Sequence, residues 1–363
     1  MVYQWYLFVL LVFVAWYATY AKQTHEVVVH GRTEKRYNWA PVLMIAVPLI
    51  ILAGTRPNIG DTGAYRASFK TMTSSFYELI TTHTKDEGFS IFSYLLKILI
   101  GNNDVLYFTI IATICIMCVV LVYKKYSCNF AMSMFLFIAS SDYIQWNYNG
   151  MRQFIAVSVI FLATDLLLEK KYLKYFAVIA LMSTIHASAL IMIPVSFFVM
   201  GEPWNKKTVI FTIGSLVAIN FSGFLREVIA EFMSETQYSG EVNQFLETVG
   251  TNVIRVFVFC IPPVLAFVFR KHLLSAKSPI LDMSANMSII SMGMYIVSAV
   301  TSGIFIGRIP IYFSLYNYIL LPWIIENVFE KKSQKLVYAV MIICYLAFYY
   351  YQMTVAWDFS GFM

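Results

Sequence analysis

Charged residues are scarce in this chain. Only 13% of its 363 residues are Asp, Glu, Lys or Arg, whereas 60% are hydrophobic. A soluble domain carries far more charge on its surface, so a soluble enzyme is excluded and an all-α, polytopic membrane protein is indicated. We expect a single membrane domain over residues 1–363.

Cysteine and histidine are also few, with five of each. The cysteines mostly lie inside apolar runs, which favours small buried hydrophobes over disulfides or a metal site. His186 has neither a Cys nor a second His at ligand spacing, so we expect no metal and no cofactor. The first twenty residues lack a basic segment and a cleavage site, and they predict a membrane helix rather than a signal peptide.

The apolar runs predict about 12 (10–12) transmembrane helices, several of them short or broken around an outward-facing cavity. They lie near residues 5–21, 40–54, 104–122, 129–141, 152–168, 172–185, 187–201, 208–222, 252–270, 283–303, 309–325 and 335–352. Lysine-rich segments in every second loop place those loops in the cytoplasm and both termini outside. Across 172–201 we expect two short helices that meet near His186.

Six arginines lie on the predicted outer side, where the positive-inside rule does not explain them. They are Arg56, Arg66, Arg152, Arg226, Arg255 and Arg308. The planar guanidinium suits phosphate, so these residues predict an outward-facing anion site. The alternative is that some of them pair with outer acids, above all Arg226 with the adjacent Glu227. The predicted outer acids are Asp61, Asp86, Glu87, Asp104, Asp142, Glu227, Glu231, Glu235, Glu241 and Glu247. The net charge of +6 comes from the inner loops and does not indicate nucleic acid.

Polar segments interrupt the apolar pattern at three places on the predicted outer face. Residues 55–103 form a long outer loop with an interfacial helix, and residues 223–251 form a second outer loop with an acidic, amphipathic helix. The third is a polar and aromatic insert at 140–153. Polar residues are costly in the hydrocarbon core, so such a segment indicates a structural or functional role.

Several short motifs in these segments resemble the EpsG family of Wzy-like polysaccharide polymerases. They are Gly60-Asp61-Thr62-Gly63-Ala64-Tyr65 with Phe69, Glu87-Gly88-Phe89, Asn149-Gly150-Met151-Arg152-Gln153-Phe154-Ile155-Ala156, His186-Ala187-Ser188-Ala189-Leu190 with Pro194, and Arg308-Ile309-Pro310-Ile311-Tyr312-Phe313. The resemblance spans about residues 55–325, and it leaves 223–251 and both termini unmatched.

The resemblance implies a multi-pass enzyme of the bacterial inner (cytoplasmic) membrane. Such an enzyme joins repeat units carried on undecaprenyl diphosphate at the outer leaflet and makes capsule, exopolysaccharide or O-antigen. It also allows a GT-C-like fold. Its expected partners are the undecaprenyl-diphosphate-linked oligosaccharide and membrane lipid, with a flippase and a chain-length regulator as further candidates.

The chemistry of this transfer assigns roles to residues in the matched motifs. A diphosphate leaving group needs cations, for which Arg152 and Arg308 are the first candidates and Arg56, Arg66 and Arg255 the next. Sugar contacts are predicted at Tyr65, Asn149, Gln153 and Tyr312, although aromatic residues gather at membrane interfaces in general. The predicted cavity lies between the 55–103 loop, the 140–153 insert, His186 and the 308–313 turn.

A base for the attacking hydroxyl is predicted among Asp61, Glu87 and His186, and the sequence does not rank them. Asp61 alternatively caps the following helix, Glu87 is alternatively a loop carboxylate, and His186 is alternatively a polar residue between two helices. Two other functions stay open. A membrane O-acyltransferase would carry a histidine near Arg or Asp at the cytoplasmic ends of early helices, and a flippase or transporter would carry midplane carboxylates.

Overall fold

The chain folds into helices that gather into two compact units. A computed structural model describes residues 2–21, 23–29, 32–73, 75–82, 86–234 and 239–356. The first unit comprises residues 1–190 and 329–363, and the second comprises residues 191–328. Each unit is described by itself.

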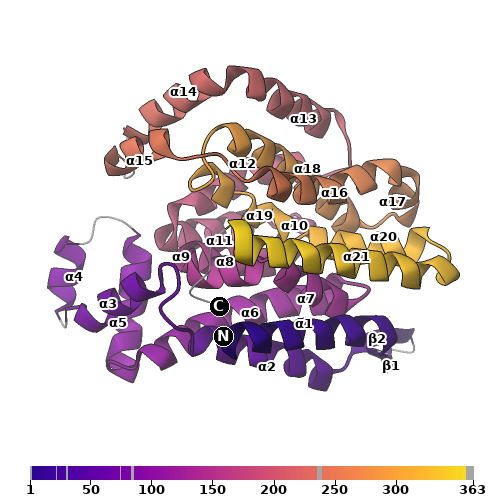
Figure 1. The fold of residues 1–363 in the computed structure, drawn as a ribbon, viewed down its shortest axis with the longest axis horizontal. Coiled ribbons are helices and arrows are strands. Elements are labelled where there is room, and N and C mark those ends of the chain that lie inside the picture. The colour runs from indigo at the N-terminus through magenta and orange to yellow at the C-terminus, as the bar shows by residue number, and fades with distance from the viewer. Residues whose placement is uncertain are drawn as a thin grey trace. The chain divides into compact units, whose positions relative to one another are not determined.

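The first unit carries the N- and C-terminal helices of the chain (Figure 1). Its helices are α1 (Val2–Tyr20), α2 (Trp39–Gly54), α3 (Thr62–Thr71), α4 (Phe76–Thr82), α5 (Glu87–Ile100), α6 (Asp104–Tyr126), α7 (Phe130–Ala139), α8 (Asp142–Tyr148), α9 (Met151–Leu162), α10 (Thr164–Leu168), α11 (Tyr172–Ile185), α21 (Lys331–Tyr351) and η5 (Gln352–Ala356). The 3₁₀ turn η1 (Ala187–Ile191) runs to the boundary between the units.

The second unit is also helical. Its helices are α12 (Met192–Val199), α13 (Lys206–Ala218), η2 (Ile219–Phe221), α14 (Ser222–Ser234), η3 (Ser239–Glu241), α15 (Val242–Glu247), α16 (Val253–Val268), α17 (Arg270–Ala276), α18 (Pro279–Val300), η4 (Ile306–Arg308), α19 (Ile311–Ser314) and α20 (Asn317–Val328). Asparagine side chains cap the first turns of α13 and α16 here, as they do for α6 and α7 in the first unit, by accepting backbone N–H bonds.

Within the part of the chain that the structure describes, a short hairpin is the exception to the predicted all-α fold. Strands β1 (Thr24–Val29) and β2 (Arg32–Tyr37) pair antiparallel in a segment that the sequence predicts as an inner loop. The run of valines at 27–29 favours a strand. The Tyr37 hydroxyl, at the end of β2, donates to the Ser127 carbonyl at 2.7 Å and accepts from the Phe130 N–H at 3.2 Å, so it ties the hairpin to the turn between α6 and α7.

The described residues contain four helices long and apolar enough to cross a membrane. The bent pair α16 and α17, with an angle of 71° between the two helices, is a fifth if it counts as one span. Several shorter apolar helices of 10–17 residues accompany them. A helical membrane protein is therefore confirmed, while the count of about twelve crossings stays a prediction.

Two segments bear on predicted boundaries. Helix α11 ends at Ile185, and His186 has extended backbone angles before η1 begins, so the predicted helix break at this histidine is confirmed. In the second unit, the helix from Lys206 to Ser234 continues through residue 222, where the sequence predicts the end of a span. The first part of the predicted 223–251 loop is therefore helix.

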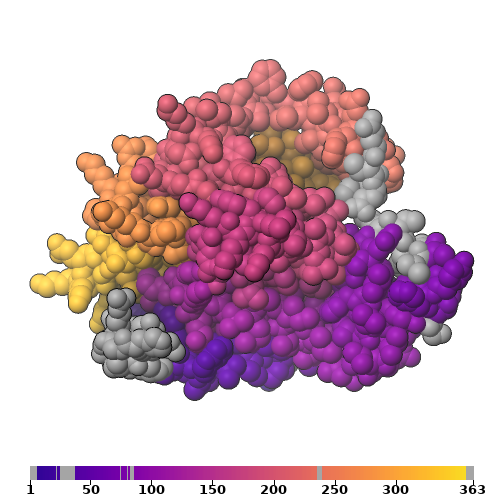
Figure 2. Space-filling view, turned by 180° about the vertical axis from the view of Figure 1, so that it is seen from behind, coloured from indigo at the N-terminus to yellow at the C-terminus, as the bar shows by residue number. Residues whose placement is uncertain are grey.

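The packing of the first unit places the helices of the predicted outer loop together at one end. Helices α2 and α9 pack on α6, and α7 is buried along its whole length. Helices α3, α4 and α5 gather at the end of this unit opposite the hairpin (Figure 1), and they form the purple surface at the right-hand edge of Figure 2. The candidate site lies where α3 and α5 meet the start of α9.

Candidate functional site

The turn before α3 is fastened to the start of α9. The backbone N–H of Asp61 donates to the side-chain oxygen of Asn149 at 3.1 Å. Gly60 has φ +53°, and a Cβ at that position would overlap the same oxygen, so both the backbone angle and the close approach require glycine. The structure thus brings two of the matched motifs together, with Asn149 contacting protein backbone.

Asp61 occupies the N-cap position of α3, but its carboxylate does not accept a capping hydrogen bond. The side chain is half-buried. The side-chain hydrogen bond that the alternative prediction requires, with Asp61 as the cap of α3, is therefore not formed. The carboxylate remains a candidate for chemistry.

Arg152 lies in the first turn of α9 and reaches the first outer loop. Its Nη1 donates to Asp86 Oδ2 at 2.8 Å, and its Nε donates to the Tyr65 hydroxyl at 3.3 Å. The guanidinium also lies 5.9 Å from the ring centre of Tyr65 and 6.0 Å from that of Phe89. The Arg152 side chain is 34% exposed, whereas that of Asp86 is 2% exposed. Arg152 is thus bound to a buried carboxylate while about a third of its own side chain stays exposed.

The start of α5 joins this group to the end of α11. Glu87 is exposed in the first turn of α5. A Cβ on Gly88 would overlap the hydroxyl of Thr184, so α5 and α11 approach closely there. His186 follows two residues later, and its Nδ1 lies 2.7 Å from the Ser188 hydroxyl. The histidine therefore lies beside the same end of α5.

Arg66 is bound to the protein on several sides. Its Nε donates to Asp104 Oδ2 at 2.6 Å, its Nη2 donates to the Arg56 carbonyl at 2.9 Å, and its Nη1 donates to the Asn58 side chain. Lys70 Nζ lies 3.1 Å from the other oxygen of Asp104. Arg66 and Arg152 thus each pair with an acid, as the alternative predicts, while their outer location stays a prediction.

Arg56 is buried, with 2% of its surface exposed. Its guanidinium lies 4.2 Å from the ring centre of Phe108 and 5.1 Å from that of Tyr148, and it donates to the Asn147 carbonyl. Its prediction as a substrate contact is untested, but this environment is that of a residue that supports the fold.

The 140–148 part of the insert is interior, where the sequence predicts an outer surface. Tyr143 donates to the Leu49 carbonyl at 2.6 Å, and Tyr148 donates to the Leu52 carbonyl at 3.1 Å. Asn147 Nδ2 donates to the Tyr143 carbonyl at 2.8 Å. Gln153, a predicted sugar contact, is also buried. Tyr143, Asn147 and Tyr148 thus find partners within the insert and in α2, away from water.

The remaining predicted site residues belong to the second unit. Arg255 is 5% exposed, and its guanidinium lies 3.4 Å from the Tyr295 hydroxyl and 5.0 Å from the ring centre of Phe259. Arg308 ends η4 and is half-buried, while Tyr312 is buried in α19.

The turn before Arg308 packs on the segment that precedes α16. The N–H of Thr251 donates to the Ser298 carbonyl at 3.0 Å, and the Ser298 hydroxyl donates to that of Thr251 at 2.8 Å. A Cβ on Gly307 would overlap the Thr251 hydroxyl. Arg308 therefore follows a tightly packed polar turn.

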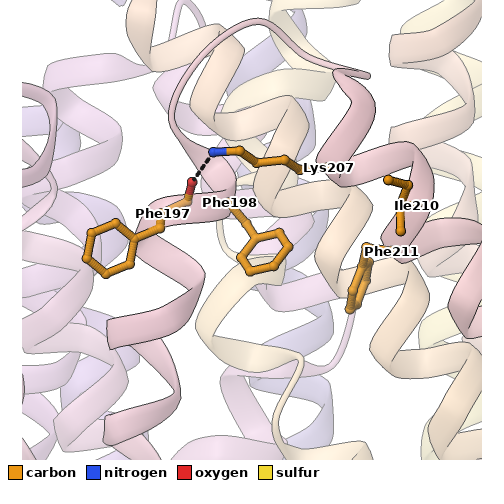
Figure 3. A pocket seen from close by; sticks show the side chains of 5 residues that line it. All are labelled: Phe197, Phe198, Lys207, Ile210 and Phe211. Atoms are coloured by element: carbon orange, nitrogen blue, oxygen red, sulfur yellow. Dashed lines mark hydrogen bonds between the residues drawn. The ribbon is translucent and has the colours of Figure 1, made fainter.

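An apolar hollow of about 490 Å³ also lies in the second unit, between α12 and α13 (Figure 3). Its walls are Phe197, Phe198, Ile210 and Phe211. Lys207 crosses its rim and donates to the Phe197 carbonyl at 3.2 Å. A surface of this composition suits hydrocarbon chains, whereas a glycan needs polar partners.

Asp86 and Asp104 are site residues that the motif reasoning did not select. Both appear in the sequence only as acids on the predicted outer side. The signal for Asp86 is its position directly before the Glu87-Gly88-Phe89 motif.

Comparison with known proteins identifies the family. The model of the EpsG family matches residues 39–362. The chain belongs to the EpsG family. This is a family of Wzy-like polysaccharide polymerases, and the resemblance of the motifs is thereby confirmed. This EpsG-family chain is a polysaccharide-polymerase-like membrane protein. Neither a curated protein nor a solved structure matches it at a significant level.

Proposed function

We propose that this protein transfers a growing glycan from polyprenyl diphosphate to a lipid-linked repeat unit at the outer leaflet of the bacterial inner membrane. Family membership supports the reaction class and favours it over the O-acyltransferase and the transporter. The observation that carries the proposal is the setting of Arg152, a partly exposed guanidinium fixed by a buried carboxylate and a phenol.

The transfer needs stabilisation of charge on the leaving group. A hydroxyl of the acceptor attacks the anomeric carbon, the bond from that carbon to the diphosphate oxygen breaks, and the bonding electrons leave with the diphosphate. Arg152 would donate hydrogen bonds to these oxygens as their charge develops, which makes the step independent of a metal. Asp86 already pairs with this arginine, so the exposure and orientation of the guanidinium, rather than net charge, would select the anion.

The proton of the attacking hydroxyl needs an acceptor. Asp61, Glu87 and His186 all belong to the end of the first unit that contains Arg152. Asp61 has the strongest support, because its turn is fixed by Asn149. It also lies one helical turn before Tyr65, whose hydroxyl contacts Arg152.

The test is polymer formation by the purified protein. Protein in detergent or nanodiscs receives polyprenyl-diphosphate-linked repeat units, and the products are separated by size. A ladder of glycans with added chelator supports the metal-independent reaction. A folded protein that makes no ladder from its own repeat unit would refute the proposal.

A further inference from the structure

We propose that Asp86 is a positioning residue that fixes the guanidinium of Arg152 for contact with the diphosphate. This role rests on the proposed function of Arg152 but concerns a different residue. Asp86 lies outside the matched motifs and does not reach the surface, because its side chain is 2% exposed.

The contact is directional. Nη1 of Arg152 donates to Asp86 Oδ2 at 2.8 Å, and Nε of Arg152 donates to the Tyr65 hydroxyl at 3.3 Å. Two partners on two different nitrogens fix both the tilt and the rotation of the planar group. A charge-assisted hydrogen bond from the guanidinium to a buried carboxylate is stronger than one in water, so this orientation persists without substrate.

The carboxylate is itself held by the backbone. Asp86 has φ 52° and ψ 48°, a left-handed conformation in which Asp and Asn are tolerated better than most residues. Its carbonyl accepts the N–H groups of Phe89 at 3.0 Å and Ser90 at 3.3 Å, which begin α5. Gly88 then packs on Thr184 of α11. Two packed helices therefore set the position of the carboxylate.

Such an arrangement lowers the cost of binding in the transition state. A free arginine side chain loses rotamer freedom when it binds an anion, whereas an anchored one has already lost it. The anchor should therefore act on the rate of transfer more than on capture of the lipid-linked substrate, because the charge on the leaving diphosphate increases in the transition state.

The experiment replaces Asp86 with Asn. Asn keeps the size and the tolerance of left-handed angles, so Asp86→Asn removes the charge with little strain. The matched control is Asp165→Asn, which removes a carboxylate paired with Lys125 and Tyr126 elsewhere in the first unit. Both variants are compared with the parent for thermal unfolding, for kinetics, and for the rate at which phenylglyoxal labels Arg152, read by mass spectrometry.

We expect Asp86→Asn to lower kcat roughly tenfold or more while KM changes less than about threefold, as loss of preorganisation requires. Labelling of Arg152 should become several times faster, because the guanidinium is released. Asp165→Asn should match the parent in both. If Asp86→Asn does not fold, Asp86→Gly replaces it, since glycine relieves the left-handed backbone.

A parent-like kcat together with parent-like labelling in the folded variant would overturn the role of Asp86. A purely structural role would instead lower the unfolding temperature and leave kcat per folded molecule unchanged, which also overturns it. Labelling does not require catalysis. A parent protein that makes no polymer thus counts against the proposed function, while faster labelling of Arg152 in Asp86→Asn still supports the anchor.

Discussion

The side-chain oxygen of Asn149 accepts the backbone N–H of Asp61 at 3.1 Å and fills the space beside Gly60. Two motifs almost ninety residues apart are joined by this contact. The glycine and the asparagine therefore depend on each other, and the position of Asp61 depends on both.

Replacement of Gly60 by alanine tests this contact. The new methyl group would force the turn away from Asn149, and alanine at φ +53° is strained, so we expect a loss of about 1–3 kcal/mol in the free energy of unfolding. Thermal unfolding in detergent measures the change.

Gly101 provides the matched control, because it has φ +65° and a Cβ added there would meet no atom within 4 Å. Gly101→Ala therefore carries the backbone strain without the overlap. Equal losses for the two variants would show that the contact with Asn149 contributes nothing.

The sequence predicts local features well where one segment determines them. The start of α9 at Met151 follows Gly150, and the break at His186 follows from two short apolar runs between lysines. The sequence also offers the pairing of Arg66 and Arg152 with outer acids as an alternative, although it does not identify the individual partners.

Features that depend on distant packing could not be predicted. Arg56 looks like a surface cation in the sequence, but the rings of Phe108 and Tyr148 and the Asn147 carbonyl stabilise it in the interior. The 140–148 insert looks exposed in the sequence because it is polar. It is buried because its tyrosines find partners in α2, about ninety residues earlier. The acidic, amphipathic helix predicted within 223–251 is present as α14, but its continuity with the preceding apolar helix is not evident from the sequence.

Arg152→Lys should lose most of the polymer even though the positive charge is kept. A lysine cannot hold Asp86 and Tyr65 while it presents further donors to a diphosphate, so we expect at least about a hundredfold lower kcat/KM. The measurement is the rate of ladder formation per folded protein. Arg270→Lys, at an exposed position on the predicted cytoplasmic side, is the control, and parent-like activity of Arg152→Lys would contradict the prediction.

Arg56→Ala should damage folding rather than one catalytic step. It removes a buried guanidinium from two aromatic rings and from the Asn147 carbonyl, so we expect roughly 2–4 kcal/mol lower stability. Folded yield and unfolding temperature measure this. If the variant is as stable as the parent and only polymer formation fails, Arg56 is a substrate contact after all.

Asp61→Asn should lower kcat on the order of a hundredfold if this carboxylate accepts the proton. Glu87→Gln should stay within a few fold of the parent, because Glu87 is exposed and outside the contacts of Arg152. The unfolding temperature of each variant shows whether the turn has kept its place. If His186→Gln loses activity while Asp61→Asn stays active, the histidine rather than Asp61 accepts the proton of the attacking hydroxyl.

The crossing pattern can be tested with one of the chain's two exposed cysteines. Cys128 lies in the turn between α6 and α7, shortly after Lys124 and Lys125, and the charge pattern places that turn in the cytoplasm. In a variant that retains Cys128 alone, a membrane-impermeant maleimide should label it in inverted vesicles and leave it unlabelled in intact cells. A second variant with cysteine only at Thr73 should give the opposite result, because the 55–103 loop is predicted outside. Labelling of both positions from the same side would refute the topology on which the outward-facing site depends.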